Sequence, residues 1–130
     1  MIVGAHVTIE NRVTIGAYTK IQTGAYITAA TTLEDYVFIA PGVVTTNDNF
    51  MGRTEERFKH WGGPTIRRGA RVGADVTLLP NVEVGEEAFV AAGSIVTRNV
   101  PAKCMVLGSP AKTKRSVPEA EWVNNGRMPK

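Results

Sequence analysis

The chain has 130 residues and a formal net charge of +3, with 43% hydrophobic and 21% charged residues. This composition predicts one globular domain spanning residues 1–130 and excludes an intrinsically disordered chain. No apolar run approaches the ~20 residues of a membrane-spanning helix, and the small positive charge does not by itself indicate nucleic-acid binding. The single cysteine, Cys104, excludes an internal disulfide. Because no signal peptide is visible, we expect a cytoplasmic protein.

An apolar residue recurs every six positions in two blocks, residues 1–44 and 66–101. These positions are Val3, Ile9, Ile15, Ile21, Ile27, Leu33 and Ile39, then Ile66, Val72, Leu78, Val84, Val90 and Val96. A small or branched residue precedes most of them by two positions, and residues i and i+2 of a strand point to the same face. Each hexad is therefore predicted to be a short strand with two inward side chains. A corner follows, where glycines such as Gly73 and Gly85 permit a sharp turn and close backbone approach.

A period of six residues fits neither an α-helix nor a coiled coil. Strand-and-corner units of equal length stack instead into a solenoid, in which each coil is hydrogen-bonded to the next. The expected fold class is therefore all-β, a parallel β-helix built from hexapeptide repeats.

After Pro101 the repeat ends, and residues 102–130 are expected to form a C-terminal tail and cap. Ser116 and Glu119 have the spacing of a capping box, and the Asn-Asn-Gly segment at 124–126 is typical of a helix stop. We expect a short helix that covers the open end of the last coil. The first coil has no such cover, which keeps open the interpretation of a truncated piece of a longer solenoid.

Residues 45–65 interrupt the repeat and are predicted to form an extruded loop. Loops of this length in a compact domain are usually functional or disordered. Phe50, Phe58 and Trp61 argue against disorder, and we expect the loop to lie against a neighbouring surface, that of another subunit. The Gly-Gly-Pro segment at 62–64 is predicted to give flexibility followed by a fixed return to the repeat.

Two loop residues are candidates for catalysis. His60 is suited to act as a general base, because histidine titrates near neutral pH, although an exposed loop histidine without a role is a close alternative. Asn47 can orient a substrate through hydrogen bonds, although Asn47 and Asp48 also fit ordinary turn chemistry. We interpret His6 as an exposed corner residue and Cys104 as a small packing residue.

A cluster of cations lies near the end of the repeat, with no acidic residue among them: Arg98, Lys103, Lys112, Lys114 and Arg115. Such a cluster suits a small ligand that carries phosphate groups. A solvated basic surface is an equally good interpretation from charge alone.

The stretch VGADVTLLPNVEVGEEAFVAAGSIVTRNVP resembles the left-handed β-helix acyltransferases. The resemblance implies three hexads per coil, a triangular cross-section and a left-handed solenoid. Thirteen hexads then make a little over four coils, a prism on the order of 20 Å tall.

The loop and its flanks look like the branch of that family that N-acetylates amino groups on nucleotide-linked sugars. The matching residues are Thr46, Asn47 and Asp48, then Arg53, then Trp61, Pro64 and Thr65. Gly52 stands where that branch usually has proline. The His-Trp pair at 60–61 is not a feature of that branch, but many members of the wider family use a loop histidine as base, which implies that role for His60. The resemblance to the branch implies a catalytic role for Asn47 and substrate contacts for Asp48, Arg53 and Trp61.

The same resemblance implies acetyl-CoA as the co-substrate, no metal, and a homotrimer that acts on small molecules rather than on nucleic acid or membranes. Small residues would contact the pantetheine arm of CoA, and cations would contact its phosphates. The small residues are Gly73, Ala74, Ala91, Ala92 and Gly93, and the cations are Lys112, Lys114 and Arg115.

Three other functions stay open at this point. An O-acetyltransferase acting on a sugar or another hydroxyl acceptor is compatible with His60. A carbonic anhydrase of the γ class shares the solenoid but needs three histidine ligands, whereas this chain has two histidines. A trimeric scaffold or a fragment of a larger enzyme would not bind CoA, so CoA binding discriminates it.

Overall fold

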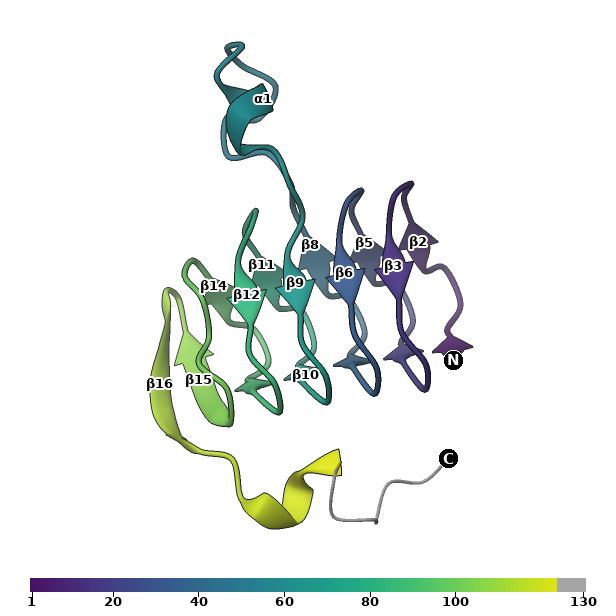
Figure 1. Cartoon of the computed structure of the whole chain (residues 1–130), viewed down its shortest axis with the longest axis vertical. Coiled ribbons are helices and arrows are strands. Elements are labelled where there is room, and N and C mark those ends of the chain that lie inside the picture. Colours follow the sequence, from purple (N-terminus) through teal and green to yellow (C-terminus); the bar gives the residue numbers. More distant parts are fainter. Residues whose placement is uncertain (124–130) are drawn as a thin grey trace.

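The computed structural model describes residues 1–123 as a prism of short parallel strands with one long loop (Figure 1). Fourteen strands of two residues each build the coils. They are β1 (Ile2–Val3), β2 (Thr8–Ile9), β3 (Thr14–Ile15), β4 (Lys20–Ile21), β5 (Tyr26–Ile27), β6 (Thr32–Leu33), β7 (Phe38–Ile39), β8 (Val44–Thr45), β9 (Thr65–Ile66), β10 (Arg71–Val72), β11 (Thr77–Leu78), β12 (Glu83–Val84), β13 (Phe89–Val90) and β14 (Ile95–Val96).

Each strand from β1 to β11 pairs with the strand three positions later in the chain, so the strands form three sheets and the prism has three faces. Sheet A contains β1, β4, β7, β10 and β13, sheet B contains β2, β5, β8, β11 and β14, and sheet C contains β3, β6, β9 and β12. Ile2 pairs with Lys20 and Val3 with Ile21, a register of 18 residues that equals three hexads. The expected left-handed parallel β-helix is thereby confirmed. We name the corners between faces AB, BC and CA.

The core is a stack of the inward hexad residues. Along sheet A, Ile21, Ile39, Val72 and Val90 lie above one another, and each is 0% exposed. Side chains of the first coil are less covered, and Val3 is 45% exposed. The column explains the six-residue period, because a polar residue at any of these positions would be buried without water.

The corners use a different chemistry from the one expected. Gly73 and Gly85 do serve close approach: a Cβ on Gly85 would lie 2.5 Å from the backbone nitrogen of Ala102 in the next coil. The sharp turn itself falls two residues later, at non-glycine residues with positive φ such as Asp75 (58°) and Glu87 (59°). At these two corners the glycines therefore set the spacing between coils and ordinary residues make the turn in the left-handed region, whereas at other corners glycine makes the turn, as Gly93 does with φ of 76°.

The loop leaves sheet B after β8 and returns to sheet C at β9, so it projects from corner BC, opposite sheet A (Figure 1). Leu33 pairs with Ile66, a separation of 33 residues instead of 18, so the loop adds fifteen residues to one coil. Helix α1 (Arg57–His60) lies within it.

Thr45 occupies a core position of the repeat, although the hexad count omits it. Its side chain is 0% exposed, and its hydroxyl accepts a hydrogen bond from Thr28 N at 2.7 Å and donates to Tyr26 O at 3.0 Å. In the neighbouring coil the equivalent backbone nitrogen, Glu10 N, donates to a main-chain carbonyl, that of Ile27. The Thr45 hydroxyl therefore replaces a backbone acceptor at the point where the main chain turns into the loop.

The last coil is shorter than the others. Val100 forms a bridge with Val84, only 16 residues earlier, and β15 (Cys104–Gly108) then joins sheet A beside β13. The sequence-based count of thirteen hexads was therefore too low, because Thr45 and Val100 also occupy repeat positions.

A β-hairpin covers the end of sheet A, where a helical cap alone was expected. Strand β16 (Ala111–Ser116) runs antiparallel to β15 and forms the outer strand of that sheet. Ser116 thus lies in a strand, and the residue preceding the 3-10 helix η1 (Glu119–Glu121) is Pro118, with no side-chain cap. The expected capping box is wrong, and the expected helix stop at 124–126 lies outside the described residues.

The segment after β16 runs along corner CA and is held by three side-chain contacts. Arg71 Nη2 lies 2.6 Å from Glu121 Oε1, and the Lys103 ammonium lies 4.4 Å from the centre of the Trp122 ring. Val123 N donates to both carboxylate oxygens of Glu87, at 3.1 and 3.3 Å. Burial is the largest influence on Glu87 and raises its pKa, against the lowering effects of the Val123 N–H and of Arg68 and Arg71.

A Glu87→Gln variant is expected to change how stability depends on pH. Because folding raises the pKa of Glu87, the folded chain binds the proton more tightly, so stability falls as pH rises from the ordinary value of 4.5 to the raised one. The amide keeps an oxygen acceptor for Val123 N and does not titrate. Urea unfolding from pH 4 to pH 7 should therefore give a flatter stability profile for Glu87→Gln than for the natural chain. Parallel profiles would contradict the assignment.

Candidate active site

The base of the loop is closed by two neighbouring coils. Gly62 N donates to Asn47 O at 3.0 Å, which joins the outgoing and returning stems. A Cβ on Gly62 would lie 2.3 Å from Asn81 Oδ1, and one on Gly63 would lie 2.6 Å from Thr31 Oγ1. The Gly-Gly pair is thus required by close packing against the coils on either side, and not by flexibility as the sequence suggested.

Asp48 organises the first turn of the loop. Its carboxylate accepts hydrogen bonds from Phe50 N and Gly52 N, both at 2.8 Å, and lies 3.7 Å from Arg57 Nη1. The hydrogen bond from Gly52 N is the largest influence and lowers the pKa of Asp48 below its ordinary value. The carboxylate is therefore occupied by the loop itself.

His60 ends helix α1 and points a largely exposed imidazole toward solvent. The side chain is 58% exposed, and its Nε2 lies 3.4 Å from Glu56 Oε1. The Phe50 ring centre lies 6.2 Å from the imidazole centre. The contact with Glu56 involves one ring nitrogen, so the other is not engaged by that carboxylate. This is an arrangement that a general base requires.

Two of the other predicted loop residues, Asn47 and Trp61, contact the solenoid. Asn47 Nδ2 lies 3.5 Å from Ala29 O, a long contact that leaves most of its hydrogen-bonding capacity open. The Arg12 guanidinium lies 4.9 Å from the centre of the Trp61 ring, so Trp61 packs along corner BC. The Arg53 side chain is exposed at the loop tip. Asn47 and Trp61 therefore both lie at the base of the loop, where Asn47 O accepts from Gly62 N.

The small residues predicted to contact CoA line corner AB. Gly73 and Ala74 follow β10, and Ala91, Ala92 and Gly93 follow β13 one coil later. Gly93 N donates to Ala74 O at 2.8 Å, and Gly93 has φ of 76° with no atom within 4 Å of a Cβ built there. The backbone at Gly93 is therefore open to an elongated ligand, whereas Gly73 packs closely against Ala92 of the next coil.

The predicted cations Lys112, Lys114 and Arg115 are exposed on β16. Gly108 N donates to Ser94 Oγ at 3.1 Å, which ties the hairpin to the residue directly after the small residues of corner AB. A pocket of about 360 Å³ lies beside the hairpin turn, and Arg98 and Lys112 are among its lining residues. The structure thus brings the basic hairpin and the upper part of corner AB together.

A family model described as bacterial transferase hexapeptide (six repeats) matches residues 63–98. These residues run from the returning stem of the loop to the end of β14, the coils that carry corner AB. Over these residues the chain carries the hexapeptide repeat of that transferase family.

Three relatives illustrate the likeness. A serine acetyltransferase of Buchnera aphidicola is 38% identical over 100 residues, which cover 77% of this chain and 34% of that protein. The crystal structure of a serine O-acetyltransferase from Brucella melitensis is 27% identical with a TM-score of 0.69, covering 85% of this chain and 41% of that one. A hexapeptide-repeat acetyltransferase of Vibrio cholerae, solved with acetyl-CoA, is 25% identical with a TM-score of 0.73, covering 90% and 68%.

The chain spans about a third of the length of that curated Buchnera relative. The three names refer to serine or to acetyl transfer in general, whereas the nucleotide-linked amino sugar of the sequence-based hypothesis is in none of them. The match supports the family and leaves the narrower branch a hypothesis.

The two halves of the predicted site lie at different corners of the prism. The loop with His60 and Asn47 leaves corner BC, whereas the small residues and the basic hairpin lie at corner AB and above it. Sheet B separates the two corners. A ligand bound at corner AB must therefore cross sheet B, or meet the loop of another chain, to reach His60.

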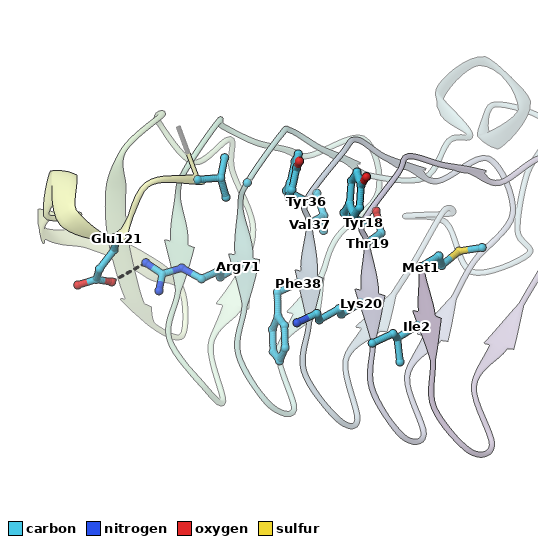
Figure 2. Close-up of a pocket in the computed structure, with 12 residues that line it drawn as sticks. Met1, Ile2, Tyr18, Thr19, Lys20, Tyr36, Val37, Phe38, Arg71 and Glu121 are labelled. Carbon is cyan, nitrogen blue, oxygen red and sulfur yellow. Dashed lines mark hydrogen bonds and ion pairs between the residues drawn. The ribbon is translucent and has the colours of Figure 1, made fainter. Parts of the chain in front are cut away.

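A further pocket of about 200 Å³ lies on sheet A, far from the loop. Figure 2 shows Tyr18 and Tyr36 from neighbouring coils side by side, with their ring centres 5.0 Å apart. Glu121 and Arg71 lie at the other end of the same pocket (Figure 2).

Among residues 1–123, no helix is long and apolar enough to cross a bilayer. The same part of the chain holds no cluster of three potential metal ligands.

Sequence reasoning missed two residues that act on the loop. Glu56 has the i, i+4 spacing to His60 that would place both on one face of a helix, so a helix prediction over 56–60 could have found it. Asn81 donates to His60 O from the next coil, across 21 residues, and no local pattern indicates that contact.

Proposed function

We propose that this protein is an acetyl-CoA-dependent acetyltransferase that acetylates a small acceptor. The observation that carries the proposal is the pairing of His60 with Glu56 on a loop extruded from a hexapeptide-repeat solenoid. The acetyl-CoA of the Vibrio relative supports the donor. Together these observations support acetyl transfer from acetyl-CoA by this chain.

The donor site we propose follows corner AB toward the hairpin. Pantetheine would lie along Gly73, Ala74 and the segment 91–93, where no side chain blocks the backbone. The phosphate groups would contact Lys112, Lys114 and Arg115, because ammonium and guanidinium groups make charge-assisted hydrogen bonds to phosphate oxygens.

The transfer we propose uses His60 as general base. The acceptor heteroatom attacks the acetyl carbonyl carbon, and the free imidazole nitrogen of His60 takes the proton that this atom loses. The C–S bond then breaks, and His60 returns the proton to the leaving CoA thiolate, so the reaction releases free thiol. Glu56 orients the imidazole. Asn47 pairs with Gly62, two residues after His60, and its amide would orient the acceptor or the acyl oxygen.

A hydroxyl acceptor is the better supported class. A neutral hydroxyl needs a base to become a useful nucleophile, and the relatives named above include serine acetyltransferases. The alternative is the amino group of a nucleotide-linked sugar, which rests on Thr46, Asn47 and Asp48. In the structure the Thr46 hydroxyl donates to Leu78 O and the Asp48 carboxylate caps the loop, so two of these three side chains already have structural partners. The amino-sugar alternative therefore rests on Asn47 alone among these three residues.

A homotrimer would bring the two corners together. In such an assembly, corner AB of one chain would face the loop of its neighbour, and the exposed Met51 and Phe58 of the loop would gain apolar contacts. The separation of the two halves of the site within one chain supports this proposal. Sedimentation equilibrium tests it, because a homotrimer has three times the mass of one chain.

The test is release of free CoA thiol from acetyl-CoA with three acceptor sets: serine and simple sugars, nucleotide-linked amino sugars, and the hydroxyl analogues of those amino sugars. Turnover with hydroxyl acceptors alone would support O-acetylation, and turnover with amino sugars alone would establish the alternative. Absence of both turnover and CoA binding would leave a non-catalytic scaffold.

Neutralising the hairpin is expected to weaken donor binding. A triple variant, Lys112→Ala with Lys114→Ala and Arg115→Ala, should raise the KM for acetyl-CoA roughly tenfold, because exposed ion pairs contribute up to about 1 kcal/mol each. The value of kcat should change little, since these residues lie far from His60. A Lys20→Ala variant on sheet A is the matched control. An unchanged KM in the triple variant would place the phosphates elsewhere.

A further inference from the structure

Asn81 holds the returning stem of the loop from the coil that follows it. Its side-chain Nδ2 donates to His60 O at 2.6 Å, and its backbone N donates to Gly62 O at 3.2 Å. Its Oδ1 occupies the space beside Gly62 where a Cβ would otherwise lie. Residues on both sides of Trp61 are therefore fixed to the solenoid by one asparagine.

Backbone conformation does not explain why this residue is asparagine. Asn81 lies at corner BC with φ of 62°, and the same left-handed conformation at this corner is adopted by Arg12 (55°) and Ala30 (66°). Asparagine is tolerant of this region, but the corner accepts other residues in the coils below. What distinguishes residue 81 is its amide, which reaches the last residue of α1.

We infer that Asn81 is a positioning residue that fixes the place of the His60 imidazole through the His60 carbonyl. This inference rests on the proposed role of His60 as base. Helix α1 has four residues, none of them buried, so the loop has little packing of its own to hold the imidazole. The hydrogen bond from the rigid solenoid supplies the reference point that the short helix lacks.

An Asn81→Asp variant tests the inference, because it keeps the size of the residue and its tolerance of positive φ but removes the Nδ2 donor. We expect kcat to fall about tenfold with the KM for acetyl-CoA unchanged, since small misplacements of a catalytic group are costly. Asn99→Asp is the matched control at the same corner. Asn99 Oδ1 accepts from Glu83 N, and a carboxylate keeps that function.

The double variant separates positioning from general damage. Asn81→Asp in a His60→Ala background should cause no further loss of activity, because the group that it positions is gone. An additional tenfold loss in the double variant would overturn the inference. Asn81→Gly, which also retains the left-handed conformation, should reproduce the single-variant loss without an added charge.

A readout without turnover keeps the inference distinct from the proposed reaction. Phe50 lies close enough to His60 for its ring current to shift the imidazole C–H resonances. That shift should diminish in Asn81→Asp and persist in Asn99→Asp, whether or not any acceptor is acetylated. An unchanged shift in Asn81→Asp would contradict positioning by Asn81. An inactive natural chain with the expected shifts would count against the acetyltransferase proposal alone.

Discussion

Replacing His60 with alanine is expected to lower kcat for acetyl transfer to a hydroxyl acceptor by about 10²–10⁴-fold, the usual contribution of a general base. The KM for acetyl-CoA should stay within about twofold, because the proposed donor contacts lie at corner AB and on the hairpin. Folding should be unaffected, since the His60 side chain is 58% exposed and contacts only the loop. The measurement is steady-state thiol release by the variant and by the natural chain.

The matched control is His6→Ala. His6 lies at corner AB in the first coil, with φ of 57°, so its replacement tests removal of a histidine without removal of the loop base. Full activity in His60→Ala would exclude a loop base. An amine that attacks without help from a protein base would then be favoured, and Asn47→Ala would become the decisive variant.

The solenoid could be predicted from the sequence because its signal is repeated. Ile21, Ile39, Val72 and Val90 occupy one column, and each coil places the same demand on the next. A periodic constraint is visible even when single positions deviate. The place of the loop was equally visible, since residues 45–65 break a period that resumes in full.

The places where prediction failed share a physical cause. Thr45 is buried at a repeat position, but it is polar where the other positions are apolar, because its hydroxyl must replace a backbone acceptor. Val100 satisfies the repeat by pairing but comes two residues early. Ser116 has capping-box spacing, yet it belongs to a strand that pairs with Cys104. In each case a contact made in three dimensions overrode the local pattern.

The candidate site was predictable in composition more than in geometry. His60 and Asn47 stand out because polar, functional side chains interrupt an apolar repeat. The partners that give them geometry come from elsewhere: Asn81 from the following coil, Ala29 from the preceding one, and Glu56 from one turn of helix. Contacts across coils depend on the register of the solenoid, which the loop shifts by fifteen residues.

A Thr45→Val variant is expected to lower the free energy of unfolding by about 1–3 kcal/mol, the cost of leaving buried polar groups without partners. Valine has nearly the same shape, so the variant makes no large cavity. It leaves Thr28 N without its acceptor and Tyr26 O without the hydroxyl donor, inside a part of the prism where Thr45 is 0% exposed. Urea unfolding followed by circular dichroism measures the loss.

Thr14→Val is the control for this substitution, because Thr14 lies on sheet C with an exposed side chain, and surface changes usually stay within about 0.5 kcal/mol. The two variants separate β-propensity, which valine raises in both, from the buried hydroxyl, which only Thr45 has. Equal stability of Thr45→Val and the natural chain would show that the main chain enters the loop without help from this hydroxyl. The expected loss, joined to a reduced kcat, would instead mean that the threonine ending β8 both closes the coil and fixes the direction in which the loop carries His60.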